Sequence, residues 1–322
     1  MTKNNTHTNL LNAVKEKLAP GTNITTKLMD ILNLGREAVY RRLRSEVYFS
    51  LDEAAAISTA LGISMDNIIG CNDPKSRSLQ LKLTSYINPS ASDYRQMDEY
   101  ISFLENLVSV GDTEIGTAAN MIPLSLLYRF GYLTRFMILK WSFQAQISNT
   151  IKSFSDILLT ERFNKLCDEN TRLAEQMENT YYIWDFLIFQ YLANDIKYFA
   201  GLRLITPDDI KLIKKDLLDA LDYFEQTAIR GQFSTGKPVQ FYISNINIDS
   251  SYTYFYSRNA NMSLGLISTF SLNTVSSLND ITTQHIQKWI LSQKRVSTLI
   301  SQSGEMQRIH FFKRQREIIK AI

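Results

Sequence analysis

The stretch ITTKLMDILNLGREAVYRRLRSE, residues 24–46, decides how the first part of this chain folds. Its first nine residues place apolar side chains at helical spacing, and Asn23 before them is a residue type that caps helices. Asn33 can adopt the left-handed conformation that a tight turn needs. Residues 36–46 then continue as a second short helix. The stretch therefore predicts a helix-turn-helix arrangement.

The two predicted helices have an apolar side and a largely basic side. The apolar residues that we expect to point inward are Leu28, Leu32, Leu34, Val39 and Leu43. The outer side carries Arg36, Glu37, Tyr40, Arg41 and Arg44. An arginine in the major groove can donate two hydrogen bonds to guanine, and the start of a helix can hold a phosphate. The candidate DNA-binding residues are accordingly Thr25, Thr26, Arg36, Glu37, Tyr40, Arg41 and Arg44. The alternative interpretation is a basic helix face that is merely solvated.

Arg42 lies nearer the apolar seam than its neighbours and has two interpretations. It could pair with Glu46, four residues later on the same helix, or it could contact a phosphate.

Three further short helices are expected around this motif. Residues 10–18 form the first, and residues 50–62 form another that opens with the capping box Ser50 and Glu53. A last turn begins at Ser64. Residues 73–79 are polar and contain a proline, so we interpret them as a linker that follows a first domain of residues 1–72.

The sequences TTKLMDILNLGREAVYRRL and SLDEAAAISTALGISMDNII resemble the lambda-repressor/Cro-like DNA-binding domain. The resemblance covers about residues 8–70 and implies a five-helix fold that binds double-stranded DNA. It also implies that Arg36, Glu37, Tyr40 and Arg41, at the start and on the outer face of the second motif helix, read bases. Two positions depart from the family pattern: Met29 stands where alanine is usual, and Asn33 stands where glycine is usual at the turn.

The remainder of the chain, residues 80–322, is expected to be mostly helical. Residues 79–87 could form a strand. Helices are predicted at 94–108, 123–147, 161–179, 181–202, 207–230, 278–301 and 304–321. Residues 239–248 and 252–258 are rich in β-branched and aromatic residues and predict a β-hairpin, to which 262–276 adds one or two strands. The expected fold class is mainly α, with a small antiparallel sheet near 239–276.

Aromatic residues crowd the predicted helix 181–202 and the predicted hairpin 239–258. One interpretation is core plus dimer interface, and the other is a pocket for an apolar or ring-bearing effector, walled by Trp184. The phrases IKYFAGLRLIT, GKPVQFYISNINIDSSYTYFY and RVSTLISQSGEMQRIHFF resemble the C-terminal regions of helix-turn-helix regulators from Bacteroides-type bacteria. That resemblance implies no particular ligand.

Composition and motifs indicate a binding protein more than an enzyme. The 322 residues include 44% hydrophobic and 21% charged residues with a net charge of +3, so any basic surface is local. Two distant cysteines exclude a disulfide framework, and charges within the apolar stretch 121–141 argue against a membrane span. The three histidines lack metal-ligand spacing, and GQFSTGK at 231–237 is expected to be a helix-to-strand loop. We therefore expect a cytoplasmic protein with no catalytic group, metal or cofactor.

These features together predict a bacterial transcription regulator. Its first domain binds double-stranded DNA, and its second makes a homodimer and could sense a small-molecule or protein effector. The heptad-like face expected to take part in burial between helices is Tyr94, Met97, Ile101, Leu104 and Val108. The alternatives are a non-DNA protein-interaction scaffold that keeps the motif, and an enzyme fused to a DNA-binding domain.

Overall fold

The chain divides into two compact units, Met1–Ser78 and Leu79–Ile322. The computed structural model describes residues 6–18, 22–63, 65, 68, 79–145, 151–259 and 262–322. Of the predicted linker 73–79, only Leu79 is among them. Each unit is described by itself below.

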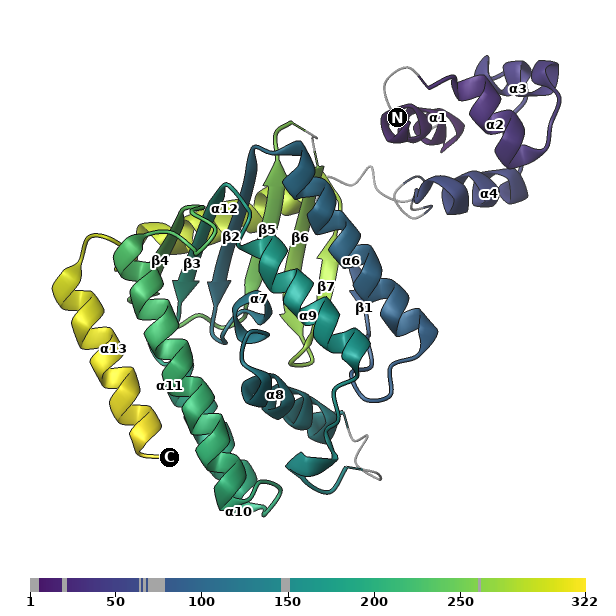
Figure 1. Ribbon diagram of the computed structural model, residues 1–322. Helices are drawn as coiled ribbons and strands as arrows, with labels where there is room; N and C mark the ends of the chain where they lie inside the picture. The colour runs from purple at the N-terminus through teal and green to yellow at the C-terminus, as the bar shows by residue number, and fades with distance from the viewer. Residues whose placement is uncertain are drawn as a thin grey trace. The chain divides into compact units, whose positions relative to one another are not determined.

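Unit 1 contains four described helices (Figure 1), namely α1 (Thr6–Lys17), α2 (Ile24–Leu32), α3 (Arg36–Leu43) and α4 (Leu51–Leu61). The Asn23 side chain caps α2 by accepting bonds from the backbone N–H groups of Thr25 and Thr26, and Asn33 ends α2 at a φ of 51°. Ser50 and Glu53 form the predicted capping box of α4. These features confirm the two motif helices and the turn between them, although α3 ends at Leu43 rather than at Glu46. The turn predicted from Ser64 lies mostly outside the described residues.

The core of unit 1 forms where α2, α3 and α4 meet. Leu28, Val39 and Ile57 each have 0% of their surface exposed. Leu32, Leu34 and Leu43 are partly buried and pack against them, as predicted. Full burial of one such side chain stabilises a fold by about 1.5–3 kcal/mol, so this seam fixes α3 against α2 and α4.

Unit 2 is a mixed α/β structure built on one eight-stranded sheet, with the strand order β1-β7-β6-β5-β2-β3-β4-β8. The strands are β1 (Gln80–Lys82), β2 (Thr113–Ala119), β3 (Asn179–Trp184), β4 (Val239–Ser244), β5 (Tyr252–Ser257), β6 (Met262–Thr269), β7 (Asn273–Ser277) and β8 (Ser297–Leu299). The central strands β2, β3 and β4 are parallel, and the other pairs are antiparallel. The fold is therefore mixed α/β: the expected high helix content is present, but the expected small antiparallel sheet near 239–276 is wrong.

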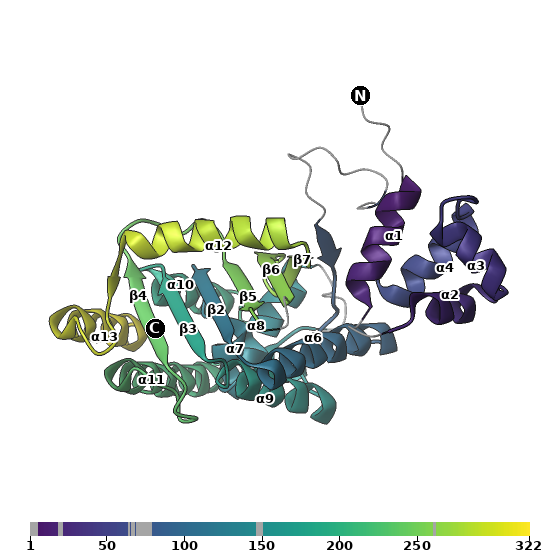
Figure 2. The same cartoon turned by 90° about the horizontal axis from the view of Figure 1, so that it is seen from above.

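Helices cover both faces of this sheet. They are α6 (Ala91–Val110), α7 (Leu124–Leu127), α8 (Gly131–Gln144), α9 (Glu161–Ala174), α10 (Ile188–Gly201), α11 (Pro207–Arg230), α12 (Asp280–Arg295) and α13 (Glu305–Lys320), with a 3₁₀ turn, η1, at Phe154–Asp156. Figure 2 shows α12 on one face of the sheet, and α6, α9 and α11 on the other. Within the residues that the structure describes, none of these helices combines the length and apolarity that a membrane span requires.

Three predicted elements have a different structure, and one of them, the predicted helix 278–301, is α12 followed by the strand β8. The predicted helix 181–202 is the end of the strand β3 followed by α10, because residues 181–184 belong to a buried central strand whose continuous apolar run does not distinguish strand from helix. The predicted hairpin 239–258 is wrong, since β4 lies between β3 and β8, and β5 lies between β2 and β6. The segment between β4 and β5 instead crosses β3 and β2, so that β5 pairs with β2 and not with β4.

Candidate nucleic-acid interface

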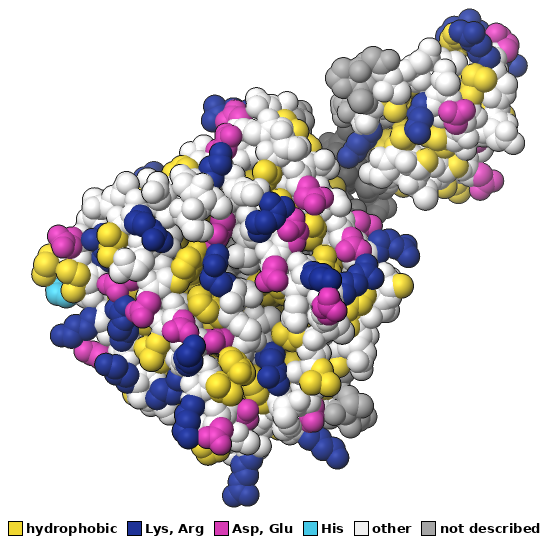
Figure 3. Space-filling view, in the orientation of Figure 1, with side chains coloured by type: hydrophobic (Ala, Val, Ile, Leu, Met, Phe, Trp, Pro, Cys, Tyr) yellow, Lys and Arg dark blue, Asp and Glu magenta, His cyan; other side chains and the backbone are white. Residues whose placement is uncertain are grey.

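The outer side of α3 carries four of the seven predicted site residues. Arg36, Glu37 and Arg41 are exposed, and Tyr40 is half-buried. Arg44 follows the last residue of the helix and is exposed too. Figure 3 shows Lys and Arg side chains gathered over this end of unit 1, with acidic side chains among them.

The two threonines at the start of α2 differ in exposure. Thr25 is 6% exposed, and its backbone N–H donates to Asn23 Oδ1 at 2.9 Å. Thr26 is exposed, and its N–H lies 3.3 Å from the same oxygen. Of the two, only Thr26 presents its side chain to solvent.

Arg36 and Tyr40 form a pair one helical turn apart. Arg36 Nη2 donates to the Tyr40 hydroxyl at 3.1 Å, and its guanidinium carbon lies 5.5 Å from the ring centroid. This hydrogen bond and the charge of Arg36 lower the pKa of Tyr40. A guanidinium has five N–H donors, so the pair leaves Arg36 with donors for a further partner.

Arg41 and Arg44 make loose ion pairs with acids on the same surface. Arg44 contacts Glu37 at 3.3 Å and Glu46 at 2.9 Å, and Arg41 lies 3.9 Å from Glu46. Exposed pairs of this kind contribute only ~0–1 kcal/mol each. An approaching phosphate or base edge could therefore replace these carboxylates at little cost.

Arg42 has a different role from its neighbours. Its Nε and Nη2 donate to the two carboxylate oxygens of Glu53 at 2.9 and 2.6 Å, and its Nη1 donates to the carbonyl of Ala38 at 3.1 Å. The predicted pair with Glu46 is wrong, because the chain after α3 returns and brings Glu53 closer. Arg42 thus clamps α3 to the start of α4 and does not point outward.

His7, which the sequence does not mark as important, also holds this junction between α3 and α4 together. The backbone N–H of Phe49 donates to His7 Nδ1 at 3.2 Å, so the ring proton lies on Nε2, which reaches the carbonyl of Arg42 at 2.9 Å. The ring also stacks on Tyr48, with centroids 4.9 Å apart. A lone histidine in a polar N-terminal segment carries no sequence signal for this role.

Among the described residues, no group of three or more His, Cys, Asp or Glu side chains is placed to hold a metal ion. Asp185 is fully buried and accepts backbone bonds from Leu187 and Ile248 at 2.8 Å each, so it anchors loops. Residues 231–237 form a turn between α11 and β4, closed by the bond from Phe233 N to Lys237 O at 2.9 Å, which confirms the predicted helix-to-strand loop.

Trp184 belongs to the core and does not wall a pocket. It is 0% exposed, and its ring centroid lies 4.9 Å from that of Phe241 and 5.1 Å from that of Phe224. Of the two interpretations of the aromatic regions, Trp184 therefore fits the core, and the alternative of a cavity that it walls does not hold. The large cavity of unit 2 lies elsewhere on the sheet, beside β2, β5, β6 and β7.

The comparisons with known proteins add no relative. No protein-family model, no curated protein and no solved structure matches the chain.

Proposed function

We propose that the chain is a sequence-specific DNA-binding transcription regulator of the lambda-repressor/Cro-like type, with α3 as its recognition helix. This proposal rests on which residues of α3 are held in the fold and which remain exposed. Val39 is fully buried and Arg42 is fixed by Glu53, while Arg36, Arg41 and Arg44 remain exposed on the outer side. A short helix held rigidly from behind, with guanidinium groups on its front, suits insertion into the major groove.

Each exposed residue has a role in this proposal. Arg36 and Arg41 read base edges, because arginine matches the two acceptors of guanine. Arg44, just after the helix, and Thr26, at the start of α2, contact phosphates. Thr25 was a candidate for the same contact, but its burial assigns it to the packing of α2. Tyr40 orients the reading arginine Arg36 through their hydrogen bond, and Glu37 pairs with Arg44.

By forming a dimer, unit 2 would bring a second DNA-binding domain to the same site. One recognition helix of eight residues makes few base contacts, and dimers of such domains bind two half-sites about one helical turn of DNA apart. We therefore propose a cytoplasmic homodimer formed through residues 80–322. The competing proposal is a protein-interaction scaffold, and it is favoured if no DNA sequence is selected.

Selection of bound fragments from a genomic pool, followed by fluorescence anisotropy on the selected duplex, tests the proposal. Arg36→Ala and Arg41→Ala should each cost about 1–3 kcal/mol for that duplex and relax the base preference at one position. Arg44→Ala should weaken binding to all sequences and reduce the salt dependence. Arg95→Ala, an exposed arginine on α6, is the matched control and should bind as the wild type does. If the Arg36 and Arg41 variants both keep full affinity and selectivity, α3 is not the reading helix.

A further inference from the structure

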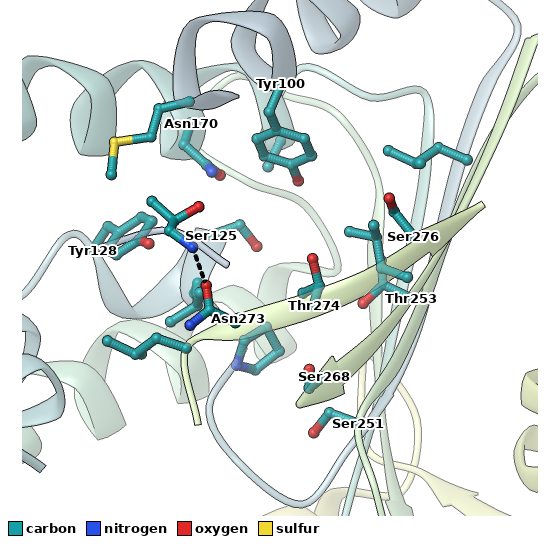
Figure 4. A pocket seen from close by; sticks show the side chains of 18 of the residues that line it. Tyr100, Ser125, Tyr128, Asn170, Ser251, Thr253, Ser268, Asn273, Thr274 and Ser276 are labelled. Carbon is teal, nitrogen blue, oxygen red and sulfur yellow. Dashed lines mark hydrogen bonds between the residues drawn. The ribbon is translucent and has the colours of Figure 1, made fainter. Parts of the chain in front are cut away.

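Unit 2 contains a cavity of about 380 Å³ between the sheet and the helices that cover one of its faces (Figure 4). Residues of β2, β5, β6 and β7 line one wall, and residues of α6, α7 and α9 line the other. The volume falls within the range of ~300–1,000 Å³ that ligand pockets show. An apolar cavity of ~150 Å³ is enough for a benzene molecule, so this one has room for two fused rings.

The two walls of the cavity differ in chemistry. The sheet wall presents hydroxyl groups from neighbouring strands, at Thr117, Thr253, Ser268, Thr274 and Ser276. The helix wall is mainly apolar and aromatic, with Met97, Tyr100, Tyr128, Phe163 and Leu166. A molecule that fits both walls has an apolar body and at least one polar edge.

The cavity offers little to a charged ligand. Among the described residues that line it, only Glu99 is charged, and Glu99 is exposed. Burial raises the pKa of Tyr100, Tyr128 and the Cys167 thiol, so these groups stay neutral at physiological pH. An anion would find no cationic partner here to offset its desolvation.

Asn170 on α9 gives the cavity one unsatisfied polar group. The residue is only 9% exposed, and its side-chain Oδ1 has no hydrogen-bond partner in the described part of the chain. Figure 4 shows its amide end directed into the cavity. By contrast, the amide of Asn273 at the opposite wall accepts a bond from the backbone N–H of Thr84 at 2.7 Å. Buried polar groups in native proteins are nearly always bonded, so Asn170 Oδ1 can take a donor from a water or from a molecule bound in the cavity.

We propose that this cavity is a binding site for an uncharged small molecule with an apolar, ring-sized body and a hydroxyl or N–H group, which the amide of Asn170 recognises. This adds a ligand class to the proposed regulator, and its test uses no DNA, so either proposal can fail alone. A hydroxyl or N–H on the ligand supplies the donor that Oδ1 lacks. The threonine and serine hydroxyls of the sheet wall then accept or donate at the ligand's polar edge.

The test is a fluorescence titration of the full chain with 2-naphthol, compared with its anionic analogue 2-naphthoate. The neutral probe should bind saturably at one site, and the carboxylate should bind at least ~tenfold more weakly because the site would have to desolvate its charge. The absence of saturable 2-naphthol binding, or equal binding of the two probes, overturns the proposal.

Two variants locate the binding in the cavity. Asn170→Leu keeps the side-chain size and should weaken 2-naphthol binding by ~tenfold. Its melting temperature should stay the same or rise, because an unsatisfied buried polar group has been removed. Asn164→Leu, the same substitution at an exposed position of α9, should change neither value. Ser268→Phe, which places a ring on the sheet wall, should abolish binding. If Asn170→Leu and Ser268→Phe both fold and bind 2-naphthol as the wild type does, the site is not this cavity.

Discussion

Arg41 and Arg42 are adjacent in α3, yet their surroundings differ completely. Arg41 has 56% of its side chain exposed and reaches one carboxylate at 3.9 Å. Arg42 has 15% of its side chain exposed and is bonded to both oxygens of Glu53, which itself accepts a bond from the backbone N–H of Ser50 at 3.0 Å. The bidentate geometry makes Arg42 part of the folded framework, while Arg41 stays available for a ligand.

Arg42→Met should destabilise unit 1 by about 1.5–3 kcal/mol, because it removes charge-assisted hydrogen bonds and leaves Glu53 without its partner. Arg41→Met should change stability by no more than about 0.5 kcal/mol, because it alters only the exposed surface. Hydrogen exchange of the amides in α2 to α4, measured on the full chain, compares the two. Equal protection in both variants would show that the clamp contributes nothing.

Glu53 gives unit 1 a dependence on pH. Burial alone would raise its pKa, but the bonds from Arg42 and Ser50 outweigh burial and lower the pKa below the ordinary value of 4.5. The stabilisation is therefore complete above pH 4.5 and is lost as the pH falls through the lower folded value. We expect the α4 amides to lose protection on acidification below that point. Glu53→Gln should be less stable near neutral pH and should show a smaller loss, and an unchanged acid response in this variant would contradict the assignment.

Local signals in the sequence correctly predict the helices whose ends are set by residues close to them in the chain. The capped helices α2 and α4 and the helix 207–230 begin and end where cap residues and periodicity place them. The central strands β2 and β3 were missed because their pattern depends on tertiary burial. The strand β2, TEIGTAA, is buried at every position except Glu114, and its apolar and polar residues do not alternate. The cavity could not be predicted at all, since its lining extends from Thr84 to Leu278 and meets only in the folded sheet.

Gly116 shows how the centre of the sheet constrains β2. It pairs with Tyr181 on one side and Tyr254 on the other, and these two rings join over it through a hydrogen bond of 2.6 Å between their hydroxyls. A Cβ at this position would lie 2.4 Å from Tyr254 Cε1 and 2.6 Å from Tyr181 Cζ.

Gly116→Ala should therefore destabilise unit 2 by about 1–3 kcal/mol through overpacking. Gly131→Ala is the matched control, because nothing lies within 4 Å of its new methyl group and alanine is the better residue in the helix α8. Calorimetric melting of the full chain should show a lower transition only for the first variant. A Gly116→Ala protein as stable as Gly131→Ala would mean that the two tyrosines are not held over β2.

The apolar face of α6 is buried inside unit 2. The face Met97, Ile101, Leu104 and Val108 of α6, which the sequence suggests for burial between helices, packs within unit 2 on α9 and the sheet. It is therefore not available to a second copy. Figure 3 shows acidic and basic side chains interspersed over the face of unit 2 that carries α6, α9 and α11, so that face has no single sign of charge. The proposed dimer therefore does not use the apolar face of α6.

The distribution of large exposed apolar side chains favours unit 2 as the part that forms the proposed dimer. Unit 1 encloses Leu28, Val39 and Ile57 completely, and its described residues expose Tyr48 and Leu51 at 60% and 75%. Unit 2 exposes many more, including Leu278 at 59%, Ile281 at 51% and Trp289 at 52%. Since association between copies is driven by burial of apolar surface, we expect residues 80–322 to be dimeric and residues 1–72 to be monomeric. Light scattering on the two fragments and on the full chain measures this directly. A fragment 80–322 that is monomeric at micromolar concentration would contradict the dimer, and two half-site binding would then need another source.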